Sequence, residues 1–176
     1  MSFKSTESMS AAELMARLQS DPEWVRKNAE RESKQNATEA AIRLESESLI
    51  ADLKAVGMNV ASVWDLVNLS TSYPQAIPVL CRHLLRPYRH EITEGIARAL
   101  TVAEARGSAA RVILAELQRL PDGAQHSVRW ALANALTKCA DASMLTEIKA
   151  LVADDRYKDV RERLKVTLAE IGERPS

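Results

Sequence analysis

The chain has 176 residues, a length that suits one globular domain with a buried core. Apolar residues make up 46% of it, but aromatic residues only 4%, and this balance favours packed helices over sheets. The formal net charge is zero, which excludes a global electrostatic attraction to nucleic acid or to anionic membranes.

The first 72 residues predict a helical cap in front of the rest of the domain. A short helix is expected over 11–18, where leucine and methionine recur on one side. A long helix is expected over 22–56, because Asp21 can cap its first turn and Gly57 suits its end. No glycine and no proline after its first residue interrupts this span, so the sequence predicts that one helix can run through it, and the alternative is a break within its polar first half.

The long helix has two halves of different character. Residues 25–36 are almost wholly polar or charged, so we expect this half to be solvated. The second half carries an apolar seam, formed by Ile42, Leu49, Leu53 and Val56. Such a seam packs either within the chain or against a second copy of it. A further short helix is expected over 62–69, where Ser62 and Asp65 form a capping box.

From residue 73 to the end of the chain, an apolar pattern recurs three times. The repeating positions are Ile92, Ile96 and Leu100, then Val128, Leu132 and Leu136, then Val160, Leu164 and Leu168. Spacing of i, i+4 and i+8 indicates one buried helix face in each copy. A less regular helix precedes each of these, so the sequence predicts three helical hairpins, at 73–107, 108–141 and 142–173, continuous with the cap at 1–72 in a single domain spanning 1–176.

The segments ITEGIARAL, VRWALANAL and VRERLKVTL, which begin at residues 92, 128 and 160, resemble the second helix of HEAT repeats. The stretch from Trp64 onward is also similar to small uncharacterised bacterial HEAT-repeat proteins. The resemblance implies an all-α fold, a right-handed α-α superhelix or solenoid, whose second helices line a concave face used for gripping macromolecules. Arg129 and Arg161 match the arginine of that family, whereas Thr93 replaces it in the first unit.

Helical geometry places one strip of each second helix opposite the buried stripe. Within that strip Trp130 occupies the position that Glu94 and Glu162 hold in the neighbouring units. The candidate partner-binding face consists of Trp130, Glu91, Glu94, Arg98, Asn134, Asp159 and Glu162. An exposed tryptophan among carboxylates suits a partner that presents Lys or Arg. In the other interpretation, the N-terminal helix or a second copy covers Trp130 and its role is structural.

Three functions therefore compete. The leading hypothesis is a non-enzymatic protein-binding module, an adaptor, immunity protein or inhibitor that grips a basic or amphipathic segment. The second is a nucleic-acid-acting protein similar to the HEAT-like alkylpurine DNA glycosylases, although the strip is acidic and the basic residues lie on first helices and loops. Those residues are Arg82, Arg86, Arg89, Arg106, Arg111 and Arg119. The third is self-assembly through the apolar seam.

No residue pattern indicates catalysis, a metal site or a cofactor. The histidines lack metal-ligand spacing, and Cys81 and Cys139 are far apart in sequence. We expect Cys81 to be buried in the core and Cys139, at a helix end, to be more accessible. The N-terminus lacks the apolar segment of a signal peptide, which predicts a reduced, cytoplasmic protein with no membrane partner.

Overall fold

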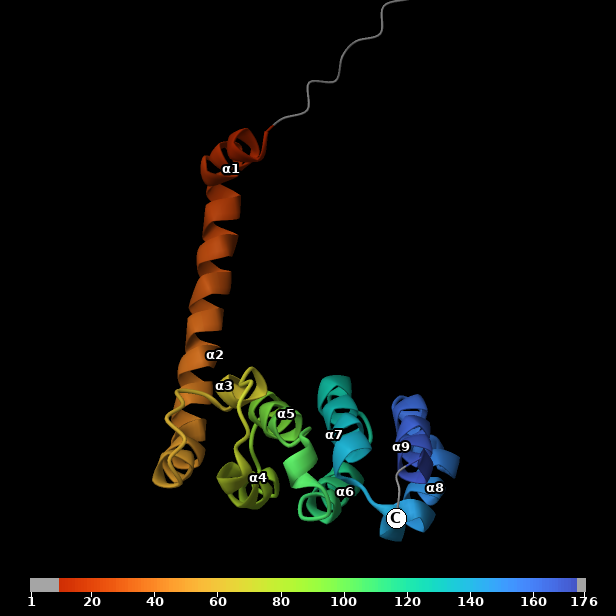
Figure 1. Ribbon diagram of the computed structural model, residues 1–176. Helices are drawn as coiled ribbons and strands as arrows, with labels where there is room; N and C mark the ends of the chain where they lie inside the picture. The colour runs from red at the N-terminus through yellow and green to blue at the C-terminus, as the bar shows by residue number, and fades with distance from the viewer. Residues whose placement is uncertain (1–9, 174–176) are drawn as a thin grey trace, which may run out of the picture. The chain divides into compact units, whose positions relative to one another are not determined.

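The computed structural model describes residues 10–173 of the chain, and all its regular structure there is helical (Figure 1). No strand occurs in that span, so the predicted all-α class is confirmed. The contacts divide the chain after Ala41, inside the long helix, into two compact units. The sequence pattern placed the end of the cap at residue 72 instead. No helix within 10–173 combines the length and the hydropathy needed to cross a membrane.

The first unit contains α1 (Ala11–Gln19) and the beginning of α2 (Pro22–Ala55). The side chain of Ser10 accepts a hydrogen bond from the backbone of Glu13, whose carboxylate accepts one in return. Asp21 accepts from the backbone N–H of Glu23 at 2.9 Å and so caps α2, as its position predicts. None of the residues of α1 is buried. The fold of this unit therefore depends on local capping and on side-chain pairs along the helix.

The polar half of α2 is stabilised by pairs of side chains three or four residues apart. Arg26 and Glu30 lie 2.8 Å apart, as do Lys27 and Glu23, and all four are well exposed. Each exposed pair of this type contributes only about 0.3–0.5 kcal/mol. The predicted solvation of residues 25–36 is confirmed, because all of them except the half-buried Asn28 are exposed.

The second unit contains the end of α2 and seven shorter α-helices. They are α3 (Val63–Val67), α4 (Ile77–Leu84), α5 (His90–Ala99), α6 (Ala110–Arg119), α7 (His126–Cys139), α8 (Leu145–Ala153) and α9 (Arg161–Glu173). Short 3-10 helices, η1 (Pro74–Ala76), η2 (Ala103–Ala105), η3 (Ala142–Met144) and η4 (Asp155–Tyr157), lie between them. The expected helix at 62–69 is thus two residues shorter at its C-terminal end, and Ser62 forms the predicted capping box with Asp65.

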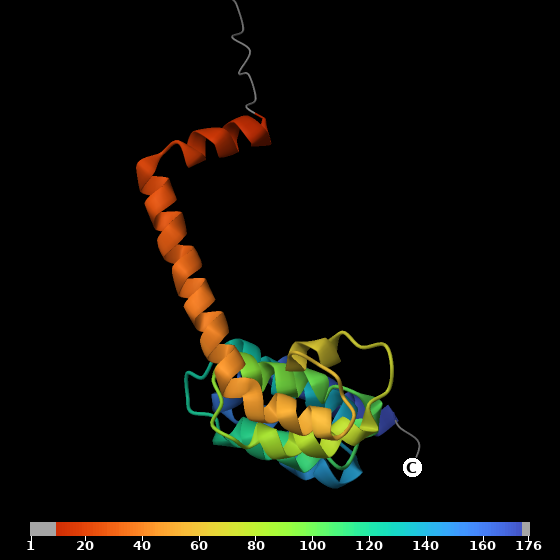
Figure 2. The same ribbon diagram turned by 90° about the vertical axis from the view of Figure 1, so that its left-hand side faces the viewer.

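The helices of this unit form three hairpins, in which α4 contacts α5, α6 contacts α7, and α8 contacts α9. The second helices follow one another in a row, since α5 contacts both α3 and α7, and α7 contacts α9 (Figure 1). In the turned view the hairpins overlap one another (Figure 2). Of the first helices, α4 also contacts α6.

The predicted apolar stripes form the core between the two helices of each hairpin. Eight of the nine positions are buried, and the last, Leu168, is half-buried against the same core. The apolar seam of α2 belongs to this core as well, because Leu49 and Leu53 have no exposed surface. The chain itself thus covers the middle of the seam, whereas Ile42 and Val56 at its ends are only half-buried, and pairing of the seam with a second copy stays a prediction.

Candidate functional site

Four side chains from four helices form an alternating row of indole and guanidinium groups across the second helices. The guanidinium carbon of Arg98 lies 5.9 Å from the ring centre of Trp64 and 5.4 Å from that of Trp130. The guanidinium carbon of Arg163 lies 5.1 Å from the ring centre of Trp130. We call these four residues the tryptophan–arginine row. Each such contact contributes about 0.5–1 kcal/mol at an exposed site.

Arg98 is fixed within the row by an ion pair along its own helix. Its Nε donates to Oε1 of Glu94 at 2.8 Å, and the side chain of Glu94 is only 14% exposed. Gly95, between them in sequence, gives Trp64 room to approach α5. A Cβ at that position would lie 3.2 Å from Nε1 of Trp64 and 2.5 Å from Cγ1 of Val63.

A small hollow of about 170 Å³ opens beside Trp130, between α7 and α9. Its lining consists of Trp130, Asp159, Val160, Glu162, Arg163 and Val166. Pockets for small molecules usually enclose roughly 300–1,000 Å³, so this hollow is closer to the size of one side chain. Trp130 itself is half-buried, and it packs against the core while contributing to this surface.

Asp159 is bound by a neighbouring helix and does not extend freely from the surface. Nε and Nη2 of Arg129 donate to its two carboxylate oxygens at 2.8 and 2.9 Å, and Nδ1 of His126 lies 3.3 Å from Oδ2. Burial raises the pKa of Asp159, but the hydrogen bonds from Arg129 and His126 outweigh it and hold that pKa below its ordinary value. Through this pair the buried Arg129 ties the second hairpin to the third.

The carboxylates of the predicted strip are all close to basic groups of the chain. Glu94 pairs with Arg98, Asp159 with Arg129 and His126, Glu162 with Lys165 at 2.7 Å, and Glu91 lies 3.4 Å from Nδ1 of His90. Asn134 is half-buried on α7. Three of the four carboxylates therefore form ion pairs with an arginine or a lysine, whereas Oε2 of Glu91 is buried and accepts no hydrogen bond from the described residues.

Two members of the row, Trp64 and Arg163, were missed by the sequence pattern. Trp64 lies before the three repeats and so outside the strip, and Arg163 falls one position outside the strip obtained from helical offsets. An offset on one helix gives the direction of a side chain but not its distance to the next helix. The available signal is that Arg163 directly follows Glu162, the residue that occupies the position of Trp130 in the next unit.

A buried histidine lies outside this face, where the end of α2 meets α4. His83 has no exposed surface, and its Nε2 lies 2.9 Å from Oδ2 of Asp52 while its Nδ1 lies 2.7 Å from the hydroxyl of Tyr88. The Tyr88 hydroxyl is 3.1 Å from that of Ser48, which accepts from Arg86. Burial lowers the pKa of His83, although the hydrogen bond to Asp52 opposes this effect.

Ionised Asp52 accepts hydrogen bonds only, so Nε2 of His83 carries the hydrogen and Nδ1 accepts from Tyr88. Each group therefore donates to the next in one chain of hydrogen bonds, which runs from Arg86 through Ser48, Tyr88 and His83 to Asp52. This network joins α2 to the first hairpin, and Glu45 adds to the junction by accepting from the backbone N–H and from Nε of Arg89.

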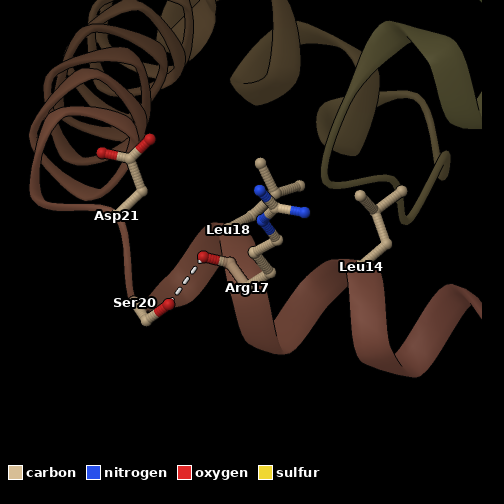
Figure 3. Close-up of a pocket in the computed structure, with 5 residues that line it drawn as sticks. All are labelled: Leu14, Arg17, Leu18, Ser20 and Asp21. Atoms are coloured by element: carbon tan, nitrogen blue, oxygen red, sulfur yellow. Dashed lines mark hydrogen bonds between the residues drawn. The ribbon is translucent and has the colours of Figure 1, made fainter. Parts of the chain in front are cut away.

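Two larger hollows lie away from the tryptophan–arginine row. One, of about 410 Å³, lies at the corner between α1 and α2 and is lined by Leu14, Arg17, Leu18, Ser20 and Asp21 (Figure 3). Ser20 donates there to the carbonyl of Arg17 at 2.8 Å, and Asp21 caps α2 (Figure 3). Another, of about 480 Å³, lies beside η4, where Arg156 pairs with Asp154.

The two cysteines have exchanged the environments expected from the sequence. Cys139 is fully buried and its thiol donates to the carbonyl of Leu100, whereas Cys81 is half-buried and burial raises the pKa of its thiol. Within residues 10–173, no three His, Cys, Asp or Glu side chains gather as a metal ion would require.

No family model, no curated protein and no solved structure matches this chain.

Proposed function

We propose that this protein is a non-enzymatic protein-binding module of the HEAT-repeat solenoid type. The second helices α5, α7 and α9 hold the partner, and Trp130 is the central contact. The observation that carries the proposal is that Trp130 is only partly buried and contacts the guanidinium groups of both Arg98 and Arg163 with its ring. A rigid, partly exposed tryptophan loses little conformational entropy on binding, and this residue type is enriched at interface hot spots.

The size and the borders of the hollow support a protein partner. A volume of about 170 Å³ suits one inserted side chain, and Val166, which is exposed, extends the apolar surface along α9. The surrounding ion pairs provide the polar rim that encloses the centre of most interfaces. An adaptor, an immunity protein and an inhibitor would all use such a face, and we propose that the protein does so in the cytoplasm.

A nucleic-acid partner has less support. Among the basic residues on the first helices and loops, four guanidinium groups form ion pairs with carboxylates of the chain: Arg82 with Asp52, Arg89 with Glu45, Arg111 with Glu147 and Arg119 with Glu116. A phosphate backbone is bound by several uncompensated cations, and these four are compensated.

Photo-crosslinking tests the proposed face. We would place benzoylphenylalanine at Val166, beside the hollow, and in a control at Leu85, which is comparably exposed at the end of α4. We expect one protein of defined mass to crosslink from position 166 only. After purification of that protein, Trp130→Ala should weaken its Kd by roughly 30-fold or more, as loss of a hot-spot residue does.

Trp130→Phe serves as the matched variant, because it keeps an aromatic ring above Arg98 and Arg163. It should retain most of the affinity. Equal crosslinking from both positions, or a Kd that Trp130→Ala leaves unchanged in a folded protein, would contradict the proposal.

A further inference from the structure

Arg163 lacks the carboxylate partner that Arg98 has. Both guanidinium groups stack on Trp130, and Arg98 is neutralised by Glu94. No carboxylate within residues 10–173 forms an ion pair with Arg163, although its side chain is half-buried. A partly desolvated guanidinium without a counter-charge interacts strongly with any carboxylate that reaches it.

The sequence provides carboxylates near Arg163, but each already has a partner. Asp159 is four residues before Arg163, as Glu94 is before Arg98, yet both of its oxygens accept from Arg129. Arg129 also donates to the carbonyl of Arg156, which fixes it beside Asp159. The carboxylate of Glu162 lies 2.7 Å from Lys165. The pairing that ties the hairpins together therefore leaves a positive charge at the edge of the hollow.

We infer that the partner is an acidic peptide segment, which presents an Asp or Glu carboxylate to Arg163 and an adjacent apolar side chain to the hollow. This inference rests on the proposed function. Trp130, Val160 and Val166 form the apolar part of the lining, and Arg163 borders the same hollow. A carboxylate and an apolar side chain on neighbouring residues can therefore engage both features together. The planar guanidinium favours two parallel hydrogen bonds to a carboxylate.

This sign of charge is opposite to that indicated by the residue types alone. A basic partner would need to compete with Arg129 for Asp159 or with Lys165 for Glu162. An acidic partner meets Arg163 without breaking any ion pair that the described residues form.

Selection from a phage-displayed library of random peptides tests the inference. The full chain is the bait, at about 0.15 M salt so that long-range attraction is screened. We expect the selected peptides to share an Asp or Glu beside an apolar residue. Arg163→Gln should weaken their Kd at least about tenfold, and Arg163→Lys by less, because lysine keeps the charge but not the planar pair of donors.

Lys149→Gln is the matched control, since it removes one positive charge from an exposed position of the neighbouring helix α8, outside the lining of the hollow, and should change the Kd less than about twofold. Near-ultraviolet circular dichroism confirms that each variant is folded. Basic or uncharged peptides that need Trp130 but not Arg163 would overturn this inference and leave the proposed function standing.

Failure to select any peptide whose binding depends on Trp130 would overturn both proposals. Duplex oligonucleotide serves as the second probe at the same salt. If the duplex binds more tightly than the selected peptides and this binding depends on Arg163, then Arg163 recognises phosphate. That result would overturn the inference that the partner is an acidic peptide.

Discussion

Gly95 is the residue whose side-chain size matters most for the geometry of the tryptophan–arginine row. We predict that Gly95→Ala lowers the free energy of unfolding by about 1–3 kcal/mol, the usual cost of overpacking a core. The added methyl group would come within 2.5 Å of the buried Val63 and would displace Trp64. Denaturant titration followed by tryptophan fluorescence measures both effects.

Gly172→Ala is the matched control, because a Cβ there meets nothing within 4 Å and α9 continues past it. It should leave stability unchanged or raise it by up to about 1 kcal/mol, since alanine favours the helix. The double variant Gly95→Ala with Val63→Ala tests the mechanism, because removing the clashing methyl groups should make the two losses less than additive.

His83 determines a dependence of stability on pH. Burial holds its pKa in the folded chain below the value of about 6.5 in the unfolded chain. Above pH 6.5 the His83 imidazole is neutral in both the folded and the unfolded chain, and its contribution to the free energy of unfolding is fully present. As the pH falls below 6.5, the imidazole of the unfolded chain binds a proton first, and the free energy of unfolding decreases. Asp52 adds to the loss only in stronger acid, because its pKa is already lowered, chiefly by the hydrogen bond from His83.

We therefore predict that the urea concentration at the midpoint of unfolding decreases as the pH is lowered from 7 to 5. His83→Gln should make this dependence on pH, the slope, smaller. The charged groups near His83 are Asp52, Arg82 and Arg86, with the Tyr88 hydroxyl on its Nδ1. His90→Gln is the control, because His90 is exposed and should leave the slope intact. An equal slope in both variants would show that another group is responsible.

At the scale of elements, α2 is held to the first hairpin by polar contacts as well as by its apolar seam. Glu45 accepts from the backbone N–H of Arg89, at the start of α5, and pairs with its side chain at 2.9 Å. Glu45→Gln should lower the free energy of unfolding by about 1 kcal/mol, a value reduced by the partial exposure of the pair. Glu47→Gln, on an exposed position of the same helix, should have no measurable effect in the same denaturation experiment.

At the scale of the whole molecule, every buried residue of the described part lies between Ser46 and Ile171. The core therefore belongs to the second unit alone. We predict that residues 40–176 unfold cooperatively with a midpoint close to that of the full chain. A peptide of residues 10–41 should be partly helical and should melt gradually, because its helices are supported only by local pairs. Circular dichroism on both pieces tests this, and a fragment 40–176 without a cooperative transition would disprove it.

The sequence by itself determined the helices and the core stripes. Capping residues fixed the start of α2 at Pro22, and Gly57, with a φ of +85°, lies just past its end. Periodic apolar residues such as Ile96 and Leu132 were placed correctly in the core, since period and burial are both properties of a single helix. These features need no knowledge of the distance between helices.

Only the tertiary structure decided the charge and the membership of the candidate face. Asp159 is neutralised by Arg129 from another helix, a contact that the sequence pattern does not contain, whereas Glu162 pairs with Lys165 three residues further along the same helix, as helical spacing allows. The contacts of Trp130 with Arg98 and Arg163 likewise depend on how closely α5, α7 and α9 approach one another. Ion pairs and ring contacts form over a few ångströms between segments some 30 residues apart, and helical periodicity does not encode such distances.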